Sequence, residues 1–376
     1  MTFPMIQFGT SRFLQAHVDL FVSEALGKGA AMGRIVAVQT TQSADSRKRI
    51  AAFAEGRPYV VRIKGIAGGA VIDSEVEVSS VGGGVNANES WAEVVRLFNE
   101  ARCMISNTAD RGYEIYASDA PEGETPRSFP AKLAKLLLAR HHAGASPITL
   151  FPCELTPDNG KTLRAVVLKV LDGWSVPAPA RRWIGEDCIW VNSLVDRIVS
   201  EPLEPLGAVA EPYALWAIEE QPGLEAPCRH ADIVVTNDLK RYERLKLFIL
   251  NLGHTWLAEI WRRRNGAPTV TVREAMGDEA MRAELDDLYE KEVLPVFAGV
   301  GMEEAACAYR DTVIDRFRNP FLDHRLAEIF INHEAKKQRR FGGLIELAEA
   351  NQCHVSQPRL RAALASNEGA VSTPTE

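Results

Sequence analysis

The sequence lacks the cysteine spacing that metal sites and disulfide frameworks require. None of its six cysteines stands in the C-x-x-C arrangement typical of zinc and redox sites. We therefore expect free thiols, as in a cytosolic protein, and no metal site. The cysteines are Cys103, Cys153, Cys188, Cys228, Cys307 and Cys353.

Long apolar runs and an excess of positive charge are also missing. No apolar stretch reaches the length of a membrane span, and residues 1–4 lead directly into an apolar segment, which leaves no room for a signal peptide. The formal net charge is −7, so the chain has no basic footprint for nucleic acid or an anionic membrane. We expect a cytoplasmic protein with neither of these partners.

The composition that remains is typical of a soluble globular protein. The chain has 376 residues, of which 46% are hydrophobic and 25% are charged. This length is enough for two domains of ordinary size.

The N-terminus begins with a strand, a glycine turn and a helix. Residues 5–8 form a short apolar segment, Gly9 follows, and a helical pattern extends to Leu26. This order is typical of a dinucleotide-binding fold, in which the pyrophosphate lies at the helix N-terminus. The glycine fingerprint is incomplete, because Ser11 and Leu14 occupy its two later glycine positions.

Polar residues follow the expected strand 34–38. An acidic residue at this point would bind the ribose diol of NAD, but the sequence has Gln39, Thr40 and Thr41, with Arg47 nearby. The missing carboxylate leaves the choice between NAD and NADP open.

Strands and helices then alternate as far as residue 236, which predicts an α/β fold with a doubly wound, Rossmann-type parallel sheet. Asn107 and Thr108 follow the strand 103–106, where they either face a ligand crevice or simply cap a loop. Asn192 precedes a helical pattern at 194–198, so it is either a site residue or a helix N-cap. Residues 59–64 and 70–79 are expected to form a hairpin around a Gly-Gly turn.

From residue 242 the pattern is almost entirely helical. We therefore predict a dinucleotide-binding domain at 1–240 and a mostly α-helical substrate domain at 241–376, with a frayed tail from Ser366. The expected helices are 242–264, 272–277, 280–296, 303–315, 319–340 and 344–350.

The stretch from Lys246 to His254 is the strongest candidate for chemistry. On an α-helix at about 100° per residue, Lys246, His254 and Asn251 fall at roughly 0°, 80° and 140°, on one face. Leu247 and Leu250 lie among them, which indicates a buried helix whose polar groups need either partners or a cleft. A lysine shielded from water can act as a general acid or base at neutral pH, and an amide can donate to a developing oxyanion. The alternative is a set of satisfied core polar groups.

At this point the sequence resembles the polyol-specific long-chain dehydrogenases, the mannitol dehydrogenase group, whose hallmark is Lys-x4-Asn-x2-His. Lys246, Asn251 and His254 match this spacing, and other matching strings follow in the same order over more than 300 residues. They include residues 7–9, 13–16, 105–108, 152–154, 158–160, 192–197, 211–216, 272–276 and 316–320.

The resemblance implies a role for each matching residue. Lys246 would be the general acid/base, Asn192 and Asn251 would flank the carbonyl oxygen, and His254 would bind a substrate hydroxyl. Arg316, His324 and, less directly, Glu220 would contact the substrate. The cofactor, NAD with NADP not excluded, would lie on Phe8, Gly9, Thr10, Ser11, Arg12, Phe13, Thr40, Asn107 and Thr108. The family works without zinc.

Within this group the sequence is most similar to the tagaturonate and fructuronate reductases, which implies reduction of a keto-sugar acid with NADH. Cations for the substrate carboxylate would come from Arg316, Arg318, Lys336, Lys337, Arg339 and Arg340. The run 336–340 can also be a solvated helix end. The alternatives are a dehydrogenase of an uncharged polyol such as mannitol or arabinitol, and a non-catalytic NAD-binding sensor. We expect a monomer or a small homo-oligomer.

Overall fold

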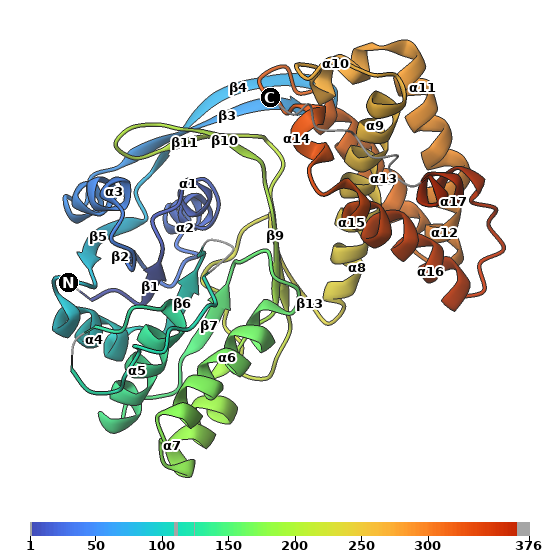
Figure 1. Cartoon of the computed structure of the whole chain (residues 1–376). Helices are drawn as coiled ribbons and strands as arrows, with labels where there is room; N and C mark the ends of the chain where they lie inside the picture. Colours follow the sequence, from blue (N-terminus) through green and yellow to red (C-terminus); the bar gives the residue numbers. More distant parts are fainter. Residues whose placement is uncertain (1, 109–111, 124, 367–376) are drawn as a thin grey trace, which may run out of the picture. The chain divides into compact units, whose positions relative to one another are not determined.

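A computed structural model describes residues 2–108, 112–123 and 125–366 (Figure 1). The chain divides into two compact units, and each is described by itself. The first consists of Met1–Ile63 and Asp73–Leu239, and the second consists of Lys64–Ile72 and Lys240–Glu376. The tail predicted to fray lies almost wholly outside the described residues.

The first unit is built on a parallel sheet of six strands in the order β5-β2-β1-β6-β7-β8. This is the doubly wound sheet that the alternating pattern predicts. The strand order reverses beside β1, and ligand crevices form at such a switch point. The strands are β1 (Met5–Phe8), β2 (Ile35–Gln39), β5 (Val81–Asn86), β6 (Cys103–Ser106), β7 (Thr149–Pro152) and β8 (Ile189–Trp190).

Helices connect these strands and cover the sheet. In α4, Val94, Leu97 and Phe98 are buried because their spacing places them on one side of the helix. The side chain of Ser128 caps the start of α5 by accepting from the amide of Ala131 at 3.2 Å. The main helices of this unit are α1 (Arg12–Gln15), α2 (Val18–Leu26), α3 (Ala44–Ala54), α4 (Trp91–Glu100), α5 (Phe129–His142), α6 (Asn159–Gly173) and α7 (Ala178–Arg182).

Two smaller sheets accompany the main one, in the orders β10-β11-β3-β4 and β13-β12-β9. The helix expected at 194–198 is wrong, because residues 194–196 belong to β9 and residues 197 and 198 lie between β9 and β10. β9 pairs antiparallel with β12, and this tertiary pairing overrides a short helical pattern. The strands are β3 (Tyr59–Ala67), β4 (Ala70–Val78), β9 (Ser193–Asp196), β10 (Val199–Pro202), β11 (Ala208–Ala210), β12 (Leu215–Glu219) and β13 (Ile233–Thr236).

The turn between β3 and β4 contacts the second unit's own helices. Gly68 and Gly69 have φ of +58° and +76°, as a tight turn requires, and the amide of Gly69 donates to Asp315 at 3.1 Å. The side chain of Asn319 donates to the carbonyl of Lys64 at 3.2 Å. The hairpin tip therefore belongs to the second unit.

The rest of the second unit, as far as residue 366, is mostly helical and has its own apolar core. Three predictions need correction here. Residues 242–264 and 280–296 are not single α-helices, because a π-helical segment interrupts each of them, at 246–251 and at 289–293. Residues 319–340 are helical only from Leu326, with a break at Asn332 (φ +57°). The helix α17 was not expected. The elements are α8 (Leu239–Leu245), η2 (Lys246–Asn251), α9 (Leu252–Arg263), α10 (Val272–Gly277), α11 (Glu279–Leu288), η3 (Tyr289–Val293), α12 (Leu294–Gly299), α13 (Glu303–Phe317), α14 (Leu326–Phe330), α15 (His333–Lys337), η4 (Gln338–Gly342), α16 (Gly343–Ala350) and α17 (Pro358–Ala365).

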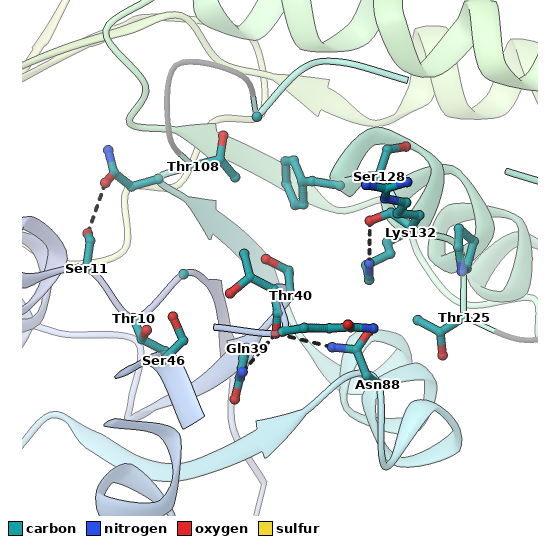
Figure 2. A pocket seen from close by; sticks show the side chains of 18 of the residues that line it. Thr10, Ser11, Gln39, Thr40, Ser46, Asn88, Thr108, Thr125, Ser128 and Lys132 are labelled. Atoms are coloured by element: carbon teal, nitrogen blue, oxygen red, sulfur yellow. Dashed lines mark hydrogen bonds between the residues drawn. The ribbon is translucent and has the colours of Figure 1, made fainter. Parts of the chain in front are cut away.

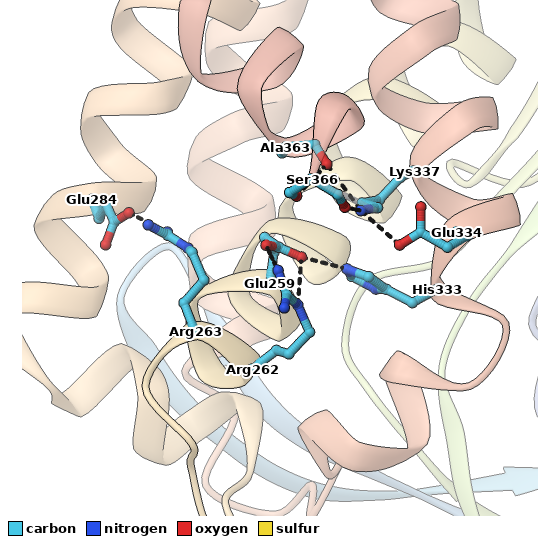
Figure 3. A network of polar contacts seen from close by, with 9 residues as sticks. All are labelled: Glu259, Arg262, Arg263, Glu284, His333, Glu334, Lys337, Ala363 and Ser366. Carbon is cyan, nitrogen blue, oxygen red and sulfur yellow. Dashed lines mark hydrogen bonds and ion pairs between the residues drawn. The ribbon is translucent and has the colours of Figure 1, made fainter. Parts of the chain in front are cut away.

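A buried polar network ties α9, α15 and α17 together (Figure 3). Glu259 accepts from His333 at 2.9 Å and also from Arg262. Burial raises the pKa of Glu259, but the hydrogen bonds from His333 and Arg262 outweigh it and lower the pKa to about 2. Lys337 is fully buried and donates to the carbonyls of Ala363 and Ser366 at 2.9 and 3.2 Å. Lys337 is thus not part of a solvated helix end.

Candidate functional site

A cavity of about 760 Å³ lies in the first unit beside the carboxyl ends of β1, β2 and β6 (Figure 2). Its size is in the range of small-molecule sites. Six of the residues predicted to bind the cofactor line it. They are Gly9, Thr10, Ser11, Thr40, Asn107 and Thr108.

Gly9 and Asn107 meet because β1 and β6 pair in register, with Phe8 opposite Ser106. Gly9 has φ of +125°, and a Cβ at this position would lie 2.7 Å from the carbonyl oxygen of Asn107. Ser11 donates to Oδ1 of Asn107 at 2.9 Å, and Nδ2 of Asn107 donates to the carbonyl of Cys153 at 2.7 Å. Only glycine fits this close approach of the turn to the next strand.

The buried carboxyl group of Glu154 binds the residues at the carboxyl end of β6. It accepts from the hydroxyl and the amide of Thr108 at 3.1 and 3.0 Å, from Ser106 at 3.2 Å and from Tyr113 at 3.0 Å. Burial raises the pKa of Glu154, and these donors oppose the rise. Glu154 positions Thr108 at the cavity wall without lining the cavity itself.

Three other predicted cofactor residues lie elsewhere. Phe8 is fully buried, and its ring contacts Phe98 and Phe129 in the core. Arg12 lines a smaller hollow next to Pro205, and the ring of Phe13 stacks on His17. None of the three lines the cavity.

Several lining residues were not among the predicted ones. Gln39 is the last residue of β2, and Thr41 and Gln42 follow it, so the strand-end rule that selected Thr40 applies equally to them. Arg49 donates to Thr10 at 3.3 Å, and Lys132 donates to the carbonyl of Arg127 at 2.8 Å. Burial lowers the pKa of Lys132 to about 8. The strand-end rule does not predict Arg49, Arg127 or Lys132, because these residues lie on helices and in a long loop.

This lining fits a nicotinamide dinucleotide. The turn at Gly9 leaves no space for a side chain, and the wall is rich in hydroxyl, amide and cationic groups that suit phosphate and ribose oxygens. Thr10, Ser11 and Arg49 would hold the phosphate and ribose parts, and Asn107 and Thr108 would lie toward the nicotinamide.

The second group of predicted residues lies in the second unit, on η2 and α9. Lys246 and Asn251 are the first and last residues of the π-helical turn, and His254 follows in α9. π-Helical turns are rare and often mark functional sites. Leu245, Phe248, Ile249 and Leu252, the apolar residues of this segment, are buried.

The side chain of Tyr289 fixes this turn. Its hydroxyl donates to the carbonyl of Ile249 at 2.8 Å. The hydroxyl fits because residue 253 is glycine, since a Cβ there would lie 2.0 Å from the Tyr289 oxygen. A tyrosine from η3 and a glycine in α9 therefore shape the backbone that carries Lys246 and Asn251.

Two predicted substrate residues accompany the motif within this unit. The rings of His254 and His324 are 5.0 Å apart, and His254 also contacts Phe317 at 4.4 Å. Burial lowers the pKa of His324, Glu328 opposes this change and Lys336 reinforces it. Arg316 is 3% exposed and donates to the hydroxyl of Tyr309 at 3.3 Å.

Asn192 and Glu220 belong to the first unit. Asn192 does not cap a helix at 194–198, because it is followed directly by the strand β9. Its amide donates to Glu219 at 2.8 Å, and its Oδ1 accepts from the amide of Lys161 at 3.0 Å, in the first turn of α6. Glu219, rather than Glu220, accepts from Asn192, and the same amide also donates to Asp158 at 3.4 Å. Glu220 is exposed, and its backbone amide pairs with Thr236.

All six cysteines are free thiols, four of them buried. In the described part of the chain, no three His, Cys, Asp or Glu side chains are grouped as a metal site would need. The described helices include none long and apolar enough to cross a membrane.

Comparison with known proteins places the chain among dehydrogenases. Residues 5–227 match the mannitol dehydrogenase Rossmann domain, and residues 238–366 match the mannitol dehydrogenase C-terminal domain. An altronate oxidoreductase of Halalkalibacterium halodurans is 30% identical over 359 residues, which cover 89% of this chain and 69% of that protein. One of Klebsiella pneumoniae is 30% identical over 393 residues, which cover 96% and 78%.

Solved structures show the same fold. A D-sorbitol dehydrogenase in substrate-free form aligns with a TM-score of 0.82 at 22% identity, over 97% of this chain and 80% of that one. Mannitol 2-dehydrogenase of Pseudomonas fluorescens, in a ternary complex with NAD and D-mannitol, aligns with a TM-score of 0.72 at 20% identity, over 97% and 78%. Since the two family matches together span both units, the chain belongs to the mannitol dehydrogenase family of oxidoreductases, as its sequence resemblance predicts.

Proposed function

We propose that the protein interconverts a keto-sugar acid of the tagaturonate type and the corresponding alcohol, altronate, with NAD(H). The relatives named altronate oxidoreductase support the substrate class, and the NAD complex of a structural neighbour supports the cofactor. The observation that carries the proposal is the Lys246, Asn251 and His254 set on one helical segment, two of them at the ends of a π-helical turn.

The chemistry divides between the cofactor and this chain's residues. When bound, the nicotinamide supplies or accepts the hydride. Lys246 gives a proton to the carbonyl oxygen in reduction and takes it from the hydroxyl in oxidation. Asn251 donates an amide hydrogen to that oxygen, and one such donor is typically worth about 3 kcal/mol of barrier. His254, Arg316 and His324 hold the rest of the substrate.

Substitution of Lys246 tests this assignment. Lys246→Ala should lower kcat by at least about 10³-fold, because the proton transfer loses its group, and should leave NADH binding nearly unchanged. Lys240→Ala, which removes an exposed lysine of α8, is the matched control. Steady-state kinetics and NADH fluorescence titration give the two readouts. A Lys246→Ala variant with near-normal kcat contradicts the proposed role.

The second candidate is a dehydrogenase of an uncharged polyol, favoured by the fold shared with mannitol and sorbitol dehydrogenases. Tagaturonate, fructuronate, fructose and mannitol, each assayed with NAD(H) and NADP(H), separate the two functions. Turnover of fructose or mannitol without turnover of either keto-sugar acid would favour the polyol.

A further inference from the structure

Two cations of the second unit have no counter-ion among the residues that the structure describes. Lys336 on α15 and Arg340 on η4 are both partly buried. In the described part of the chain, neither has a carboxylate within ion-pair distance. Arg339, between them in the sequence, is exposed, and Lys337 is committed to the carbonyls of α17. Lys336 and Arg340 thus differ in their environment from the basic residues Lys337 and Arg339.

Each of the two cations has N–H groups that form no hydrogen bond to a described residue. The Lys336 ammonium donates to the carbonyl of Ile329 at 2.7 Å, which uses one of its three hydrogens. Nη1 of Arg340 donates to the carbonyl of Asn251 at 3.1 Å and to Thr255 at 2.6 Å. Its Nε and Nη2 groups make no hydrogen bond to a described residue.

The pKa values of Lys336 and Arg340 show that burial and a neighbouring positive charge destabilise each of these cations. Burial lowers the pKa of Lys336, and the charge of Arg340 lowers it further. Burial also lowers the pKa of Arg340 to about 10, and Arg339 adds to this effect. Partly buried like charges without a carboxylate destabilise one another, and a bound anion would remove that repulsion.

Both cations border the Lys-Asn-His motif. Arg340 binds the backbone of Asn251, the last residue of the π-helical turn. Lys336 is close enough to His324 to lower its pKa, and the His324 ring lies 5.0 Å from that of His254. An anion held by Lys336 and Arg340 would therefore lie beside the residues assigned to the substrate.

We propose that Lys336 and Arg340 form the subsite that binds the carboxylate of a sugar acid, and so distinguish it from an uncharged ketose or polyol. This inference rests on the proposed function, because it names the group of that substrate which the second unit recognises. Charge-assisted hydrogen bonds to a carboxylate supply the preference, and an uncharged substrate leaves the two cations without an anion.

Direct binding tests the subsite without turnover. Thermal shift of the full-length protein is measured with D-altronate and with mannitol, in the wild type, in Lys336→Gln and in Arg339→Gln. We expect altronate to stabilise the wild type and Arg339→Gln, and the apparent Kd for altronate to rise at least about tenfold in Lys336→Gln. Arg339→Gln removes the same charge from an exposed position. Equal affinity of Lys336→Gln and wild type for altronate, or no altronate binding by the wild type, would overturn the subsite.

Kinetics separates failure of this inference from failure of the proposed function. Lys336→Gln should raise KM for tagaturonate at least about tenfold and change kcat little, because the lost contact binds ground state and transition state alike. Wild-type turnover of tagaturonate with unchanged KM in Lys336→Gln would leave the function intact and refute the subsite. A wild type that binds altronate through Lys336 yet turns over only mannitol would refute the function alone.

Arg340 needs a different substitution, because it also supports Asn251. Arg340→Lys keeps the charge but loses the two-pronged geometry of the guanidinium. We expect it to raise KM for tagaturonate and also to lower kcat, since the backbone of the π-helical turn loses a donor. An Arg340→Lys variant with wild-type altronate affinity would exclude Arg340 from the subsite.

Discussion

Gly9 determines how closely the first turn approaches the neighbouring strand. Its φ of +125° and the 2.7 Å distance from a Cβ to the Asn107 carbonyl leave no position for a side chain. Any substitution therefore moves either the turn or Asn107, and both line the cavity. The two later glycines of the dinucleotide-binding fingerprint are absent, so Gly9 is the fingerprint position at which a side chain is not tolerated.

Gly9→Ala should weaken NADH binding at least about tenfold, because alanine at positive φ is strained by on the order of 1–2 kcal/mol and the clash adds to this strain. NADH fluorescence titration measures the effect. Gly29→Ala is the control, since Gly29 also has positive φ but a Cβ there meets nothing within 4 Å. Similar NADH affinity in Gly9→Ala and Gly29→Ala would contradict this role.

Site residues that follow a strand can be predicted from the sequence, whereas residues that position another side chain cannot. Gly9, Thr40 and Asn107 are predictable because parallel strands end at one edge of the sheet. Glu154 was missed as a positioning residue, because its donors come from Ser106, Thr108 and Tyr113, about 40 or more residues away in sequence. Only the folded chain shows that these groups meet.

The π-helical turn η2 is the element that most changes the picture derived from the sequence. Apolar spacing indicates a buried helix but cannot distinguish π from α geometry, since the difference is one hydrogen-bond register over a single turn. The determinants lie outside the turn, in the Tyr289 hydroxyl, in the space above Gly253 and in the Arg340 guanidinium. The strand at 193–196 was missed for the same reason, because its partner residues in β12 lie 19 to 25 positions later in the sequence.

Gly253→Ala tests this element. Its Cβ would collide with the Tyr289 hydroxyl, so we expect a loss of stability of about 2 kcal/mol or more and a lower kcat, because Lys246 and Asn251 would shift.

Removal of the hydroxyl provides the matched test. Tyr289→Phe loses one hydrogen bond, and the double variant Gly253→Ala/Tyr289→Phe should be more stable than Gly253→Ala alone, since the clash is relieved. Urea unfolding and kcat are measured on all three. Additive effects of the two substitutions would show that the hydroxyl and Gly253 are not coupled.

At the scale of the whole molecule, each unit contains a buried carboxyl group, and the pKa values of the two groups are shifted in opposite directions. Burial raises the pKa of Asp19 in the first unit to about 7, although Tyr59 donates to it at 2.8 Å. Glu259 in the second unit has a pKa of about 2, because His333 and Arg262 stabilise its charge. Each unit has its own core, so the two carboxyl groups affect different parts of the molecule.

The sign of each effect follows from proton linkage. Folded Asp19 holds a proton that the unfolded chain releases near pH 4, so its contribution to stability falls as the pH rises from about 4 to about 7. Folded Glu259 stays ionised below its unfolded pKa, so its contribution is lost as the pH falls from about 4.5 toward 2. Calorimetry of the wild type, Asp19→Asn and Glu259→Gln between pH 3 and 8 measures both. Asp19→Asn should flatten the decline between pH 4 and 7, and an unchanged slope would contradict the assignment.

The nine residues Lys64–Ile72 have a consequence for how this protein can be divided. They are encoded near the start of the chain, yet Asp315 and Asn319 bind their backbone. A fragment that begins at Lys240 would carry every helix of the second unit but not the hairpin tip those two side chains hold. No single cleavage therefore yields both units complete, and a free-standing version of the second unit would need this short peptide grafted back onto it.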